Sequence, residues 1–428
     1  MPLSIKIVTI FPEFFDSPLS CGLMGRAVET GLLRVEFINP RDFAEDRHKS
    51  VDDRPYGGGP GMVMLPGPLD RALRSAGENG RRLLMSAQGR PLDQSAVLDL
   101  AREENLVVVC GRYEGIDARI QDKFALEPVC VGDFVLNGGE VAAMSLIEAV
   151  SRQIPGFMGK LDSAEEESFA GGLLEYPHYT RPEVFAGYKV PEILLSGDHG
   201  RIKNWRRSQS LKSTLLTRPD LLDDACLNQS DADELRTVPG RRVAANIYLA
   251  LVHYPVLNKF GKVSITSLTN LDIHDIGRVS RTYGIGRYFI CTPVNDQQCL
   301  AKRLLGHWVA GSGAAGNPDR SEALSGIEVL DDLEAAKKRV VAVSGMEPSV
   351  VTTSARLGKN SVTPGYVRGL AHDRPVLLVL GTGHGLAPEL MRGSDHILRP
   401  LRFLSDYNHM SVRSAASIIL DRTLGDYN

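Results

Sequence analysis

Two glycine-rich segments are the first places in this sequence where residue types and spacing could serve chemistry: residues 56–62 (YGGGPGM) and 381–386 (GTGHGL). Glycine lets a backbone approach a ligand closely, and a helix that starts beyond such a loop offers unpaired N–H groups. Neither segment contains the Lys-Ser/Thr pair of a P-loop, and neither matches G-x-G-x-x-G at the start of a helix. The pattern favours the uncharged nucleoside portion of a ligand over a triphosphate, although tight turns explain either segment alone equally well.

A basic cluster lies between His199 and Arg218, a stretch that contains no acidic residue. Its charged members are Arg201, Lys203, Arg206, Arg207, Lys212 and Arg218, with Trp205 among them. Clustered cations suit contacts with RNA phosphates, and an indole ring can stack on a base. A solvated helix face is the alternative interpretation of such a run of charge.

Other reactive residue types give weaker signals. Six cysteines lie far apart with no C-x-x-C pair, so neither a zinc site nor a disulfide framework is expected. In the second half, His274, His384 and His409 fit core or turn positions better than catalytic ones, and no carboxylate stands out as a base. A dinucleotide-dependent enzyme is also disfavoured, because its glycine fingerprint and the acidic ribose contact after it are absent.

The elements that must position these residues follow an α/β pattern with largely parallel sheets. Short apolar runs predict strands at residues 5–10, 34–38, 83–85, 106–110 and 129–131. Helices are predicted at residues 200–216, 230–237 and 240–253. A second α/β region follows, with strands at 263–266, 287–292, 340–344 and 375–380 and a final helix at 410–424. Pro239 and Gly240 place the boundary at about residues 237–243.

Length and composition limit the class of protein. A chain of 428 residues predicts two or three domains of about 150 residues each. The net charge of -3 argues against non-specific coating of nucleic acid, but it leaves room for a local basic patch. The apolar run at residues 3–10 is too short for a signal peptide, and no stretch approaches the roughly 20 uncharged apolar residues that span a bilayer. We therefore expect a cytoplasmic protein.

The two α/β regions echo one another. In each, an apolar run enters a glycine-rich turn, at Gly111 and at Gly381, and a later segment leads into a helix rich in small residues. Gly111 to Gly138 and Gly381 to Asn408 both span 27 positions. Two copies of one ligand-binding architecture explain this echo, although a shared α/β rhythm can also produce it by chance.

Read as a set, five segments of the first half resemble the bacterial tRNA (guanine-N1)-methyltransferase family, TrmD, in order and spacing. They are residues 56–62 (YGGGPGM), 85–89 (MSAQG), 110–117 (CGRYEGID), 131–140 (VGDFVLNGGE) and 172–182 (GLLEYPHYTRP). The resemblance covers residues 1–238. It implies a trefoil-knotted α/β domain of the SPOUT type over residues 1–162, a linker and small helical tRNA-binding domain over 163–240, and a homodimer with the active site between subunits.

The resemblance also implies that S-adenosyl-L-methionine (SAM) binds in the knot, held mainly by backbone groups of three loops. By motif position the SAM-binding residues are Met85, Ser86, Gly111, Tyr113, Glu114, Gly115, Val131, Gly132, Asp133, Phe134, Val135, Leu136, Gly138 and Gly139. The tRNA-binding residues are Tyr179, Arg181, Arg201, Lys203, Arg206 and Arg207. A requirement of activity for Mg²⁺ is a further expectation from the family.

The implied reaction is methylation of N1 of guanosine 37 in tRNA. Guanine N1 needs a base to remove its proton, and a nearby cation stabilises the charge that spreads onto O6. By motif position the cation is Arg152, and the base is Glu167, where many family members have Asp. The longer side chain predicts activity with a rate cost. A solvated acidic linker is the alternative interpretation of residues 165–167, and a non-catalytic tRNA-binding factor is the alternative for the protein.

The second half, residues 241–428, resembles a family of stand-alone SAM-dependent RNA methyltransferases also assigned to the SPOUT superfamily. The segments that carry this resemblance are residues 381–386 (GTGHGL), 398–401 (LRPL) and 407–416 (YNHMSVRSAA), and residues 267–278 offer a polar loop toward substrate. By position, a second SAM lies against Gly381, Gly383, Gly385, Leu398, Pro400, Asn408 and Ser411. The alternative is a module that has lost catalysis and binds RNA or stabilises an assembly.

Overall fold

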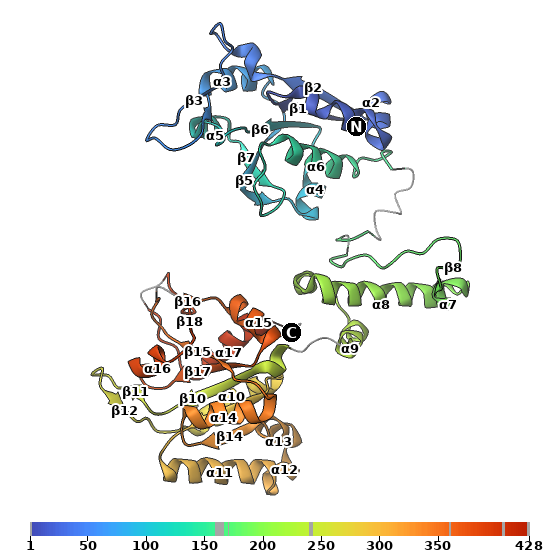
Figure 1. Ribbon diagram of the computed structural model, residues 1–428. Helices are drawn as coiled ribbons and strands as arrows, with labels where there is room; N and C mark the ends of the chain where they lie inside the picture. Colours follow the sequence, from blue (N-terminus) through green and yellow to red (C-terminus); the bar gives the residue numbers. More distant parts are fainter. Residues whose placement is uncertain are drawn as a thin grey trace. The chain divides into compact units, whose positions relative to one another are not determined.

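The computed structural model describes residues 2–158, 167–169, 171–238, 243–358, 361–404 and 407–425 (Figure 1). The chain divides into two compact units, Met1–Ala232 and Asp233–Asn428. The expected domain boundaries at 162/163 and 240/241 lie outside the described residues. Among the described residues, no helix is long and apolar enough to cross a membrane.

The first unit is built on a five-stranded parallel sheet in the order β2-β1-β6-β5-β7. Its strands are β1 (Leu3–Val8), β2 (Leu33–Ile38), β5 (Arg81–Pro91), β6 (Asn105–Cys110) and β7 (Glu127–Cys130). All five strands predicted for this region are confirmed, and β5 is longer than predicted. Because both faces of a parallel sheet are covered, strands such as β6 are buried apolar runs.

Helices cover both faces of this sheet. One apolar core joins it to α2 (Gly22–Glu29), α4 (Gln94–Leu100) and α6 (Glu140–Ser151). The other core joins it to α3 (Pro66–Ser75) and α5 (Ala118–Phe124). The short elements are η1 (Pro12–Phe15), α1 (Asp16–Ser20), η2 (Pro40–Phe43) and the hairpin of β3 (Asp52–Asp53) and β4 (Val63–Met64).

The rest of the first unit is mainly helical. It contains the hairpin of β8 (Val184–Phe185) and β9 (Tyr188–Lys189), α7 (Glu192–Leu195), α8 (His199–Thr217), η4 (Pro219–Asp223) and the start of α9 (Gln229–Thr237), which crosses the division after Ala232. Helix α8 begins where the Asp198 side chain accepts a hydrogen bond from the backbone N–H of Arg201, an N-cap that satisfies one of the free donors of the first turn. The helices predicted at 200–216 and 230–237 are confirmed.

The second unit has a seven-stranded parallel sheet in the order β14-β13-β10-β17-β15-β18-β16. Its strands are β10 (Ile247–Val252), β13 (Arg287–Cys291), β14 (Ile327–Leu330), β15 (Ser349–Thr353), β16 (Ser361–Val362), β17 (Val376–Gly381) and β18 (His396–Leu398). A hairpin of β11 (Val256–Leu257) and β12 (Val263–Ser264) lies outside this sheet. The predicted α/β class with parallel sheets is therefore confirmed.

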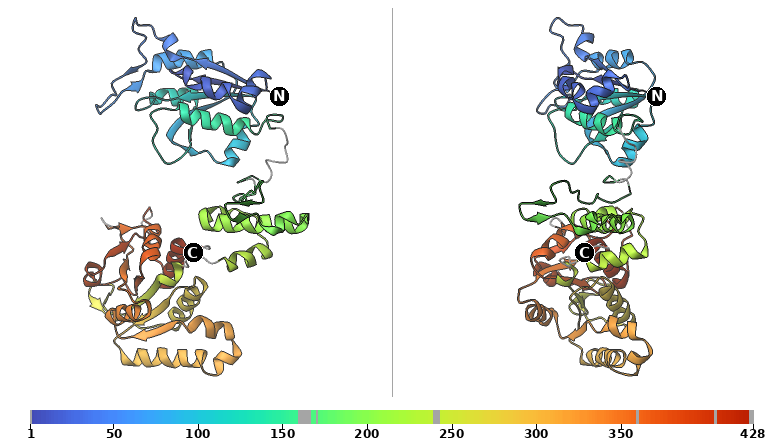
Figure 2. Two further views of the ribbon diagram at one scale, coloured as in Figure 1. Left: turned by 45° about the vertical axis from the view of Figure 1, so that its right-hand side comes forward. Right: turned by 90° about the vertical axis from the view of Figure 1, so that its right-hand side faces the viewer.

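Helices flank the second sheet on both sides (Figure 2). The helices are α10 (Asn270–Thr282), α11 (Asn295–Val309), α12 (Ser312–Gly316), α13 (Pro318–Leu324), α14 (Leu333–Ser344), α15 (Pro364–Asp373), α16 (Pro388–Arg392) and α17 (Val412–Leu424), with η5 (Val243–Asn246) before β10. Apolar residues of α10, α15 and α17 belong to one core, and those of α14 belong to the other.

The two sheets share one strand order. Without the edge strands β14 and β16, the second sheet places its second, first, fourth, third and fifth strands side by side, as the first sheet does. In both sheets the helix that follows the fifth strand, α6 or α17, packs on the apolar core. This agreement supports the hypothesis that the chain contains two copies of one architecture.

Two predictions of local structure are wrong. The helix predicted at 240–253 is, where described, the short η5 turn followed by β10, whose six residues are all buried. An uninterrupted apolar run is compatible with either a helix or a strand. Here it forms a strand because it lies between two neighbouring strands of the sheet. The strand predicted at 340–344 is the end of α14, which starts at the Asp332 cap and stops at Gly345, where φ is 74°.

Candidate cofactor and RNA sites

Three predicted SAM-binding segments of the first unit meet beside the carboxyl end of β6: Met85 lies within β5, Gly111 follows β6, and Gly139 precedes α6. The backbone N–H of Gly139 donates to the carbonyl of Gly111 at 2.9 Å. A Cβ placed on Gly139 lies 2.8 Å from Cys110 Cα and 3.1 Å from Met85 Cβ, closer than a side chain allows. The structure thus brings together Met85, Gly111 and Gly139, one residue from each of the three predicted SAM loops.

The order of the strands marks the same place. The chain passes from β1 to β2 on one side, whereas β6, β5 and β7 lie on the other, so strand order reverses between β1 and β6. In open α/β sheets, ligands bind outside the carboxyl ends of the strands at such a switch point. Thr9 and Gly111, the residues that follow β1 and β6, lie at this switch point.

A buried polar triad lies under this point and was not predicted from the sequence. Glu140, 1% exposed, accepts a hydrogen bond from the Thr9 hydroxyl at 2.8 Å. Arg112 Nε lies 2.9 Å from the other Glu140 oxygen, an ion pair without full hydrogen-bond geometry. The Arg112 guanidinium also covers the Phe11 ring at 4.5 Å, and its side chain fills the space that a Cβ on Gly138 needs. Arg112 therefore ties the β6 loop to the loop before α6.

The loop from Tyr113 to Gly115 is held against the first glycine-rich segment. Tyr113 and Gly115 have φ values of 59° and 120°. The N–H of Glu114 donates to the carbonyl of Met62 at 2.9 Å, and its carboxylate fills the space beside Gly61. Burial raises the pKa of Tyr113, and a hydrogen bond with Asp52 adds to the effect. The end of the first glycine-rich segment, Gly61 and Met62, thus borders the predicted cofactor loop.

The third predicted loop is anchored at its start and exposed beyond it. The Cys130 thiol donates to the carbonyl of Gly132 at 2.9 Å, and the Phe134 ring packs on Gly132. Phe134, Val135 and Leu136 are 56%, 90% and 38% exposed. The other predicted residues of these loops lie partly exposed or exposed: Ser86, Val131 and Asp133. Among the described residues, no contact joins residues 133–136 to Gly111 or Gly139.

Arg152 and Glu167 form an ion pair. Arg152 is the C-cap of α6, and its Nη2 lies 2.6 Å from Glu167 Oε1, with the two side chains 37% and 33% exposed. The segment after Glu167 is fixed by two hydrogen bonds, from Glu175 N to Ser168 Oγ and from Phe169 N to Leu173 O. Residues 165 and 166 of the predicted acidic linker lie outside the described residues. The structure therefore brings together the predicted cation and the predicted base.

The Arg152–Glu167 ion pair and the contact between Gly111 and Gly139 lie at opposite ends of α6. The helix runs for 12 residues from Glu140, beside Gly139, to Ser151, beside Arg152. At 1.5 Å of rise per residue the two ends are about 18 Å apart.

Aromatic and basic side chains of the predicted RNA-binding region surround a cavity of about 200 Å³. The Tyr179 and Trp205 rings lie 6.3 Å apart, and Arg206 covers the Tyr176 ring at 4.7 Å. Arg181, Arg201 and Lys203 are exposed, and among the described residues none of the three has an ion pair. Their charge is available to a polyanion.

Two other arginines of the basic cluster have structural partners. Arg207 Nη2 lies 2.9 Å from the buried carboxylate of Asp231 and joins α8 to α9. The hydrogen bond from Arg207 holds the pKa of Asp231 below its usual range. Arg218 pairs with Asp220 at 2.6 Å. Arg207 thus has a packing role that the sequence did not indicate, beside its predicted contact with tRNA.

The second unit places its own glycine loop at the carboxyl end of β17. Gly383 and Gly385 have φ values of 62° and 106°, and Leu257 exchanges backbone hydrogen bonds with His384 and Gly385 at 2.9 and 2.8 Å. The hydroxyls of Thr266 and Thr382 form a hydrogen bond beside this loop. The loop is therefore fastened to the segment that follows β10, where strand order again reverses.

The remaining residues predicted to contact a second SAM lie along the segment between β18 and α17. Leu398 ends β18 and is buried, Pro400 follows it, and the Asn408 amide donates to the carbonyl of Ala355 at 2.8 Å. Ser411 caps α17 and accepts from the N–H of Ser414 at 3.2 Å. No described contact joins Asn408 or Ser411 directly to Gly381; Gly381 ends β17, whereas Asn408 and Ser411 follow β18, and β15 lies between these two strands.

The histidines divide by environment. His384 and His409 are exposed, whereas His274 packs edge-on against Trp308 at 6.0 Å. The sequence did not indicate His253, which follows β10 and is fully buried. Its Nδ1 lies 3.3 Å from the Thr266 hydroxyl, and burial lowers its pKa to about 4.

Comparison with known proteins bears on both units. A family model described as tRNA (Guanine-1)-methyltransferase TrmD matches residues 3–224. A relative named tRNA (guanine-N(1)-)-methyltransferase, from Oleidesulfovibrio alaskensis, is 56% identical over 99% of this chain and 100% of its own length.

The chain belongs to the TrmD family.

Its second unit is shared by some relatives and absent from others. A relative of the same name from Nitratidesulfovibrio vulgaris is 57% identical over 98% of this chain and 99% of its own. The one from Actinobacillus succinogenes is 51% identical over 56% of this chain, yet 99% of its own length is covered. Residues 246–425 match a separate family described as SAM-dependent RNA methyltransferase. This TrmD-family chain therefore carries a second domain that shorter members lack.

The described side chains do not form a cluster of the kind that binds a metal ion. Across the part of the chain that the structure describes, no three His, Cys, Asp or Glu side chains gather as a metal-binding group. The Mg²⁺ requirement expected from the TrmD family therefore rests on resemblance alone.

The exposed cations of α8 give a first testable expectation. Replacing Arg201 and Lys203 with Gln should weaken tRNA binding and lower the slope of log Kd against log salt by about 1.5, because each lost phosphate contact removes about 0.7–0.9 from that slope. Fluorescence anisotropy with labelled tRNA at several salt concentrations measures this. Arg218→Gln, at a residue already paired with Asp220, is the matched control and should change the slope little. An unchanged slope in the double variant refutes the assignment.

His253 gives a second expectation, on pH. Its folded pKa of about 4 lies below the unfolded value of about 6.5, so the unfolded chain takes up a proton that the folded chain refuses. Stability of the second unit is therefore fully present above pH 6.5 and falls as the pH drops toward 4, by up to about 3 kcal/mol. Thermal unfolding of the full chain between pH 7.5 and 4.5 should show a steeper loss than in His253→Gln. His372→Gln, at an exposed histidine, should follow the wild type; equal pH profiles in all three chains contradict the expectation.

Proposed function

We propose that this chain methylates N1 of guanosine 37 in tRNA with SAM as methyl donor. Membership of the TrmD family supports the reaction. The observation that carries the proposal is the Arg152–Glu167 pair, at 2.6 Å, in a unit whose three glycine-containing loops converge. A pair of this kind supplies both groups that the reaction needs, a proton acceptor and a cation.

The loops of the first unit fit SAM as a ligand. At Gly139 a Cβ meets backbone at 2.8 Å, so only glycine lets the two loops join there, and in our proposal the backbone around this junction presents N–H and C=O groups to the ligand. Such groups suit the polar edges of an uncharged adenosine. Met85, Ser86 and residues 111–115 and 131–139 line this cradle in our proposal. Bound SAM supplies an electrophilic methyl group.

The catalytic roles follow from charge and position. Glu167 accepts the proton of guanine N1, and Arg152 donates hydrogen bonds to O6 as negative charge develops there. In the structure the two side chains contact each other and are 37% and 33% exposed, so an incoming base can reach and separate them. Glutamate reaches one methylene further than the aspartate found in many family members. We expect a modest rate cost from this looser positioning.

The separation along α6 supports a dimer. The Arg152–Glu167 pair lies about 18 Å along the helix from Gly139 of the same chain. Reacting groups must meet within about 3–3.5 Å. We infer that each pair serves the cradle of a second copy, so the active unit is a homodimer with the site between subunits.

The remaining fold assignments are also proposals. Strand order 2-1-4-3-5, in which β6 lies between β1 and β5, is compatible with the trefoil-knotted SPOUT domain that we propose over residues 1–162. Residues 163–240 form the linker and tRNA-binding helices, and residues 241–428 form a second SPOUT-like domain. A tRNA-modifying role points to the cytoplasm.

For the second unit we propose a second SAM-dependent RNA methyltransferase. Its support is the shared strand order together with the family match over residues 246–425. The alternative, a non-catalytic module for RNA binding or assembly, predicts a single SAM site per chain. Calorimetric titration of the full chain with SAM separates the two, because two sites per chain support the enzyme and one supports the module.

The proposal for the first unit is tested with tRNA transcripts. The full chain and SAM should place a methyl group on N1 of guanosine 37, read by nuclease digestion and mass spectrometry. A transcript with inosine 37, which keeps the N1 proton, should remain a substrate, and one with adenosine 37 should not. Methylation at another position or atom overturns the assignment.

A further inference from the structure

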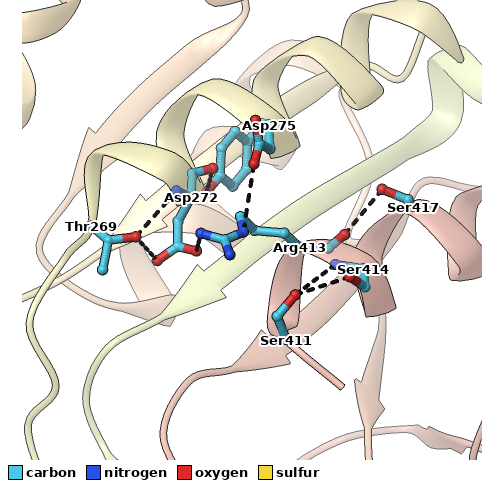
Figure 3. Close-up of polar contacts among 8 residues, drawn as sticks. Thr269, Asp272, Asp275, Ser411, Arg413, Ser414 and Ser417 are labelled. Carbon is cyan, nitrogen blue, oxygen red and sulfur yellow. Dashed lines mark hydrogen bonds and ion pairs between the residues drawn. The ribbon is translucent and has the colours of Figure 1, made fainter.

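An arginine of the second unit lies between two carboxylates at the start of α17. Arg413 Nη1 lies 3.9 Å from Asp272 Oδ1, and its Nε lies 3.5 Å from Asp275 Oδ2 (Figure 3). Both aspartates belong to α10, whereas Arg413 is the second residue of α17. The sequence placed these residues in two segments of interest, 267–278 and 407–416, but it assigned none of the three an individual role.

These residues lie beyond the carboxyl ends of the strands, the side of the sheet on which the ligand is expected. Helix α17 follows β18, and its cap is Ser411, one of the residues predicted to contact SAM. The segment before α10 is fastened at the carboxyl end of β10, where Thr266 N donates to His253 O at 3.0 Å. Arg413 and the start of α10 therefore lie beyond carboxyl ends of the parallel strands, the side on which such sheets bind ligands.

The two aspartates differ in environment. The Asp272 side chain is 10% exposed and accepts from the Thr269 hydroxyl at 2.6 Å, while its own N–H donates to the same oxygen at 3.2 Å. This reciprocal cap fixes Asp272 in the first turn of α10. The Asp275 side chain, one turn later, is 52% exposed, and Arg413 is its partner among the described residues. Asp272 is thus a fixed carboxylate near the arginine, and Asp275 is the more exposed of the two.

Arg413 is not closed into a structural salt bridge. Both of its carboxylate distances exceed hydrogen-bond length, whereas Arg207 reaches the buried Asp231 at 2.9 Å. Among the described residues its guanidinium makes no hydrogen bond, although its side chain is only 30% exposed. Five N–H donors are thus held near two carboxylates and remain available.

We propose that Asp275 and Arg413 are the base and the cation of a second methyl-transfer centre, which acts on an RNA nucleobase with a ring N–H beside a carbonyl. This rests on the proposed function of the second unit as an RNA methyltransferase. The pair matches Arg152 and Glu167 of the first unit in chemistry and in partial exposure. The two pairs differ in position along the helix: Arg413 lies in the first turn of α17, whereas Arg152 lies at the carboxyl end of α6, the corresponding helix of the first unit.

The reaction balances with groups that are named. Asp275 accepts the proton of the ring nitrogen, the nitrogen electron pair forms a bond to the sulfonium methyl carbon of SAM, and the carbon–sulfur bond breaks. The products are the N-methylated base, S-adenosylhomocysteine and protonated Asp275, which returns its proton to water. Arg413 donates to the carbonyl oxygen, where negative charge collects in the transition state.

The chemistry of the pair selects the nucleophile. A ring N–H beside a carbonyl is far more acidic than a ribose hydroxyl. A carboxylate is a weak base, so it can remove the ring proton more readily than the hydroxyl proton. The same ring offers a carbonyl oxygen for the guanidinium. Guanine N1 and uracil N3 each carry a proton beside a ring carbonyl. A ribose hydroxyl has no adjacent carbonyl oxygen that the guanidinium could bind.

The test uses the full chain with Glu167→Gln, which silences the first centre. RNA from cells depleted of this protein is incubated with labelled SAM, and methylated nucleosides are identified by mass spectrometry. Adding Asp275→Asn should lower the remaining methyl incorporation at least 100-fold, as expected for loss of a general base, and Arg413→Met should lower it to a similar degree. Asp296→Asn, at an exposed aspartate in the first turn of α11, is the matched control and should keep full incorporation.

Two binding readouts separate catalysis from folding and from the proposed function. Calorimetry should find two SAM per chain in the Asp275→Asn chain as in its parent, with an unchanged thermal midpoint. Full incorporation in Asp275→Asn, or a 2′-O-methyl product, overturns the pair while leaving the second methyltransferase intact. A parent chain that binds one SAM and transfers no methyl group overturns the second methyltransferase itself. Two bound SAM without transfer to any RNA overturns the catalytic pair.

Discussion

Glu167→Gln should lower the rate of tRNA methylation by about 10²- to 10⁴-fold, the range lost when a general base is removed. The amide keeps the size of the side chain and can still accept from Arg152, whose Nη2 lies 2.6 Å from the carboxylate. It cannot take the proton of guanine N1. Single-turnover kinetics with saturating SAM and tRNA measure the chemical step.

Two further variants sharpen this expectation. Glu29→Gln removes the same charge from the exposed end of α2 and should leave the rate unchanged. Glu167→Asp restores the residue common in the TrmD family and should methylate at least as fast as the wild type. SAM affinity should be equal in all four chains, because Glu167 is proposed to act on guanine N1 and makes no described contact with the glycine loops. A Glu167→Gln chain that keeps full activity refutes the role of base.

Much of the first unit could be predicted because its signals are local or carried by long motifs. Buried parallel strands such as β6 are continuous apolar runs, and the turns after them are marked by glycines. The Arg152–Glu167 contact was predicted from motif position, and the structure brings the two side chains together. No periodicity in the sequence could have indicated that contact.

The rest depended on tertiary context. Residues 247–252 (IYLALV) form a central strand because neighbours on both sides supply hydrogen bonds, which a single sequence does not show. Residues 340–344 end a helix although their composition is β-branched, because packing of Val340 outweighs weak propensity. Pairs such as Arg413 with Asp275 join residues 138 positions apart, so chain spacing gave no signal for a base in the second unit.

Arg112→Met should destabilise the first unit by about 3–5 kcal/mol, the cost of leaving a buried charge without its partner. Glu140 is 1% exposed and keeps the Thr9 hydroxyl as its one other partner among the described residues. Methionine preserves packing against Phe11 but offers no charge. Urea unfolding of the full chain, followed by a probe in the first unit, measures the loss. SAM affinity should fall as well, because Arg112 ties together two of the loops that meet at Gly139.

A second substitution distinguishes charge from packing. Adding Glu140→Gln to Arg112→Met removes the uncompensated charge, and an amide at that position can still accept from Thr9. The double variant should therefore be more stable than Arg112→Met alone, because neutral hydrogen-bonded groups cost far less to bury than an unpaired carboxylate. Arg102→Met, at an exposed arginine without an ion pair among the described residues, should change stability by less than about 0.5 kcal/mol. If Arg112→Met behaved like Arg102→Met, the buried pair would not hold the cofactor loops in place.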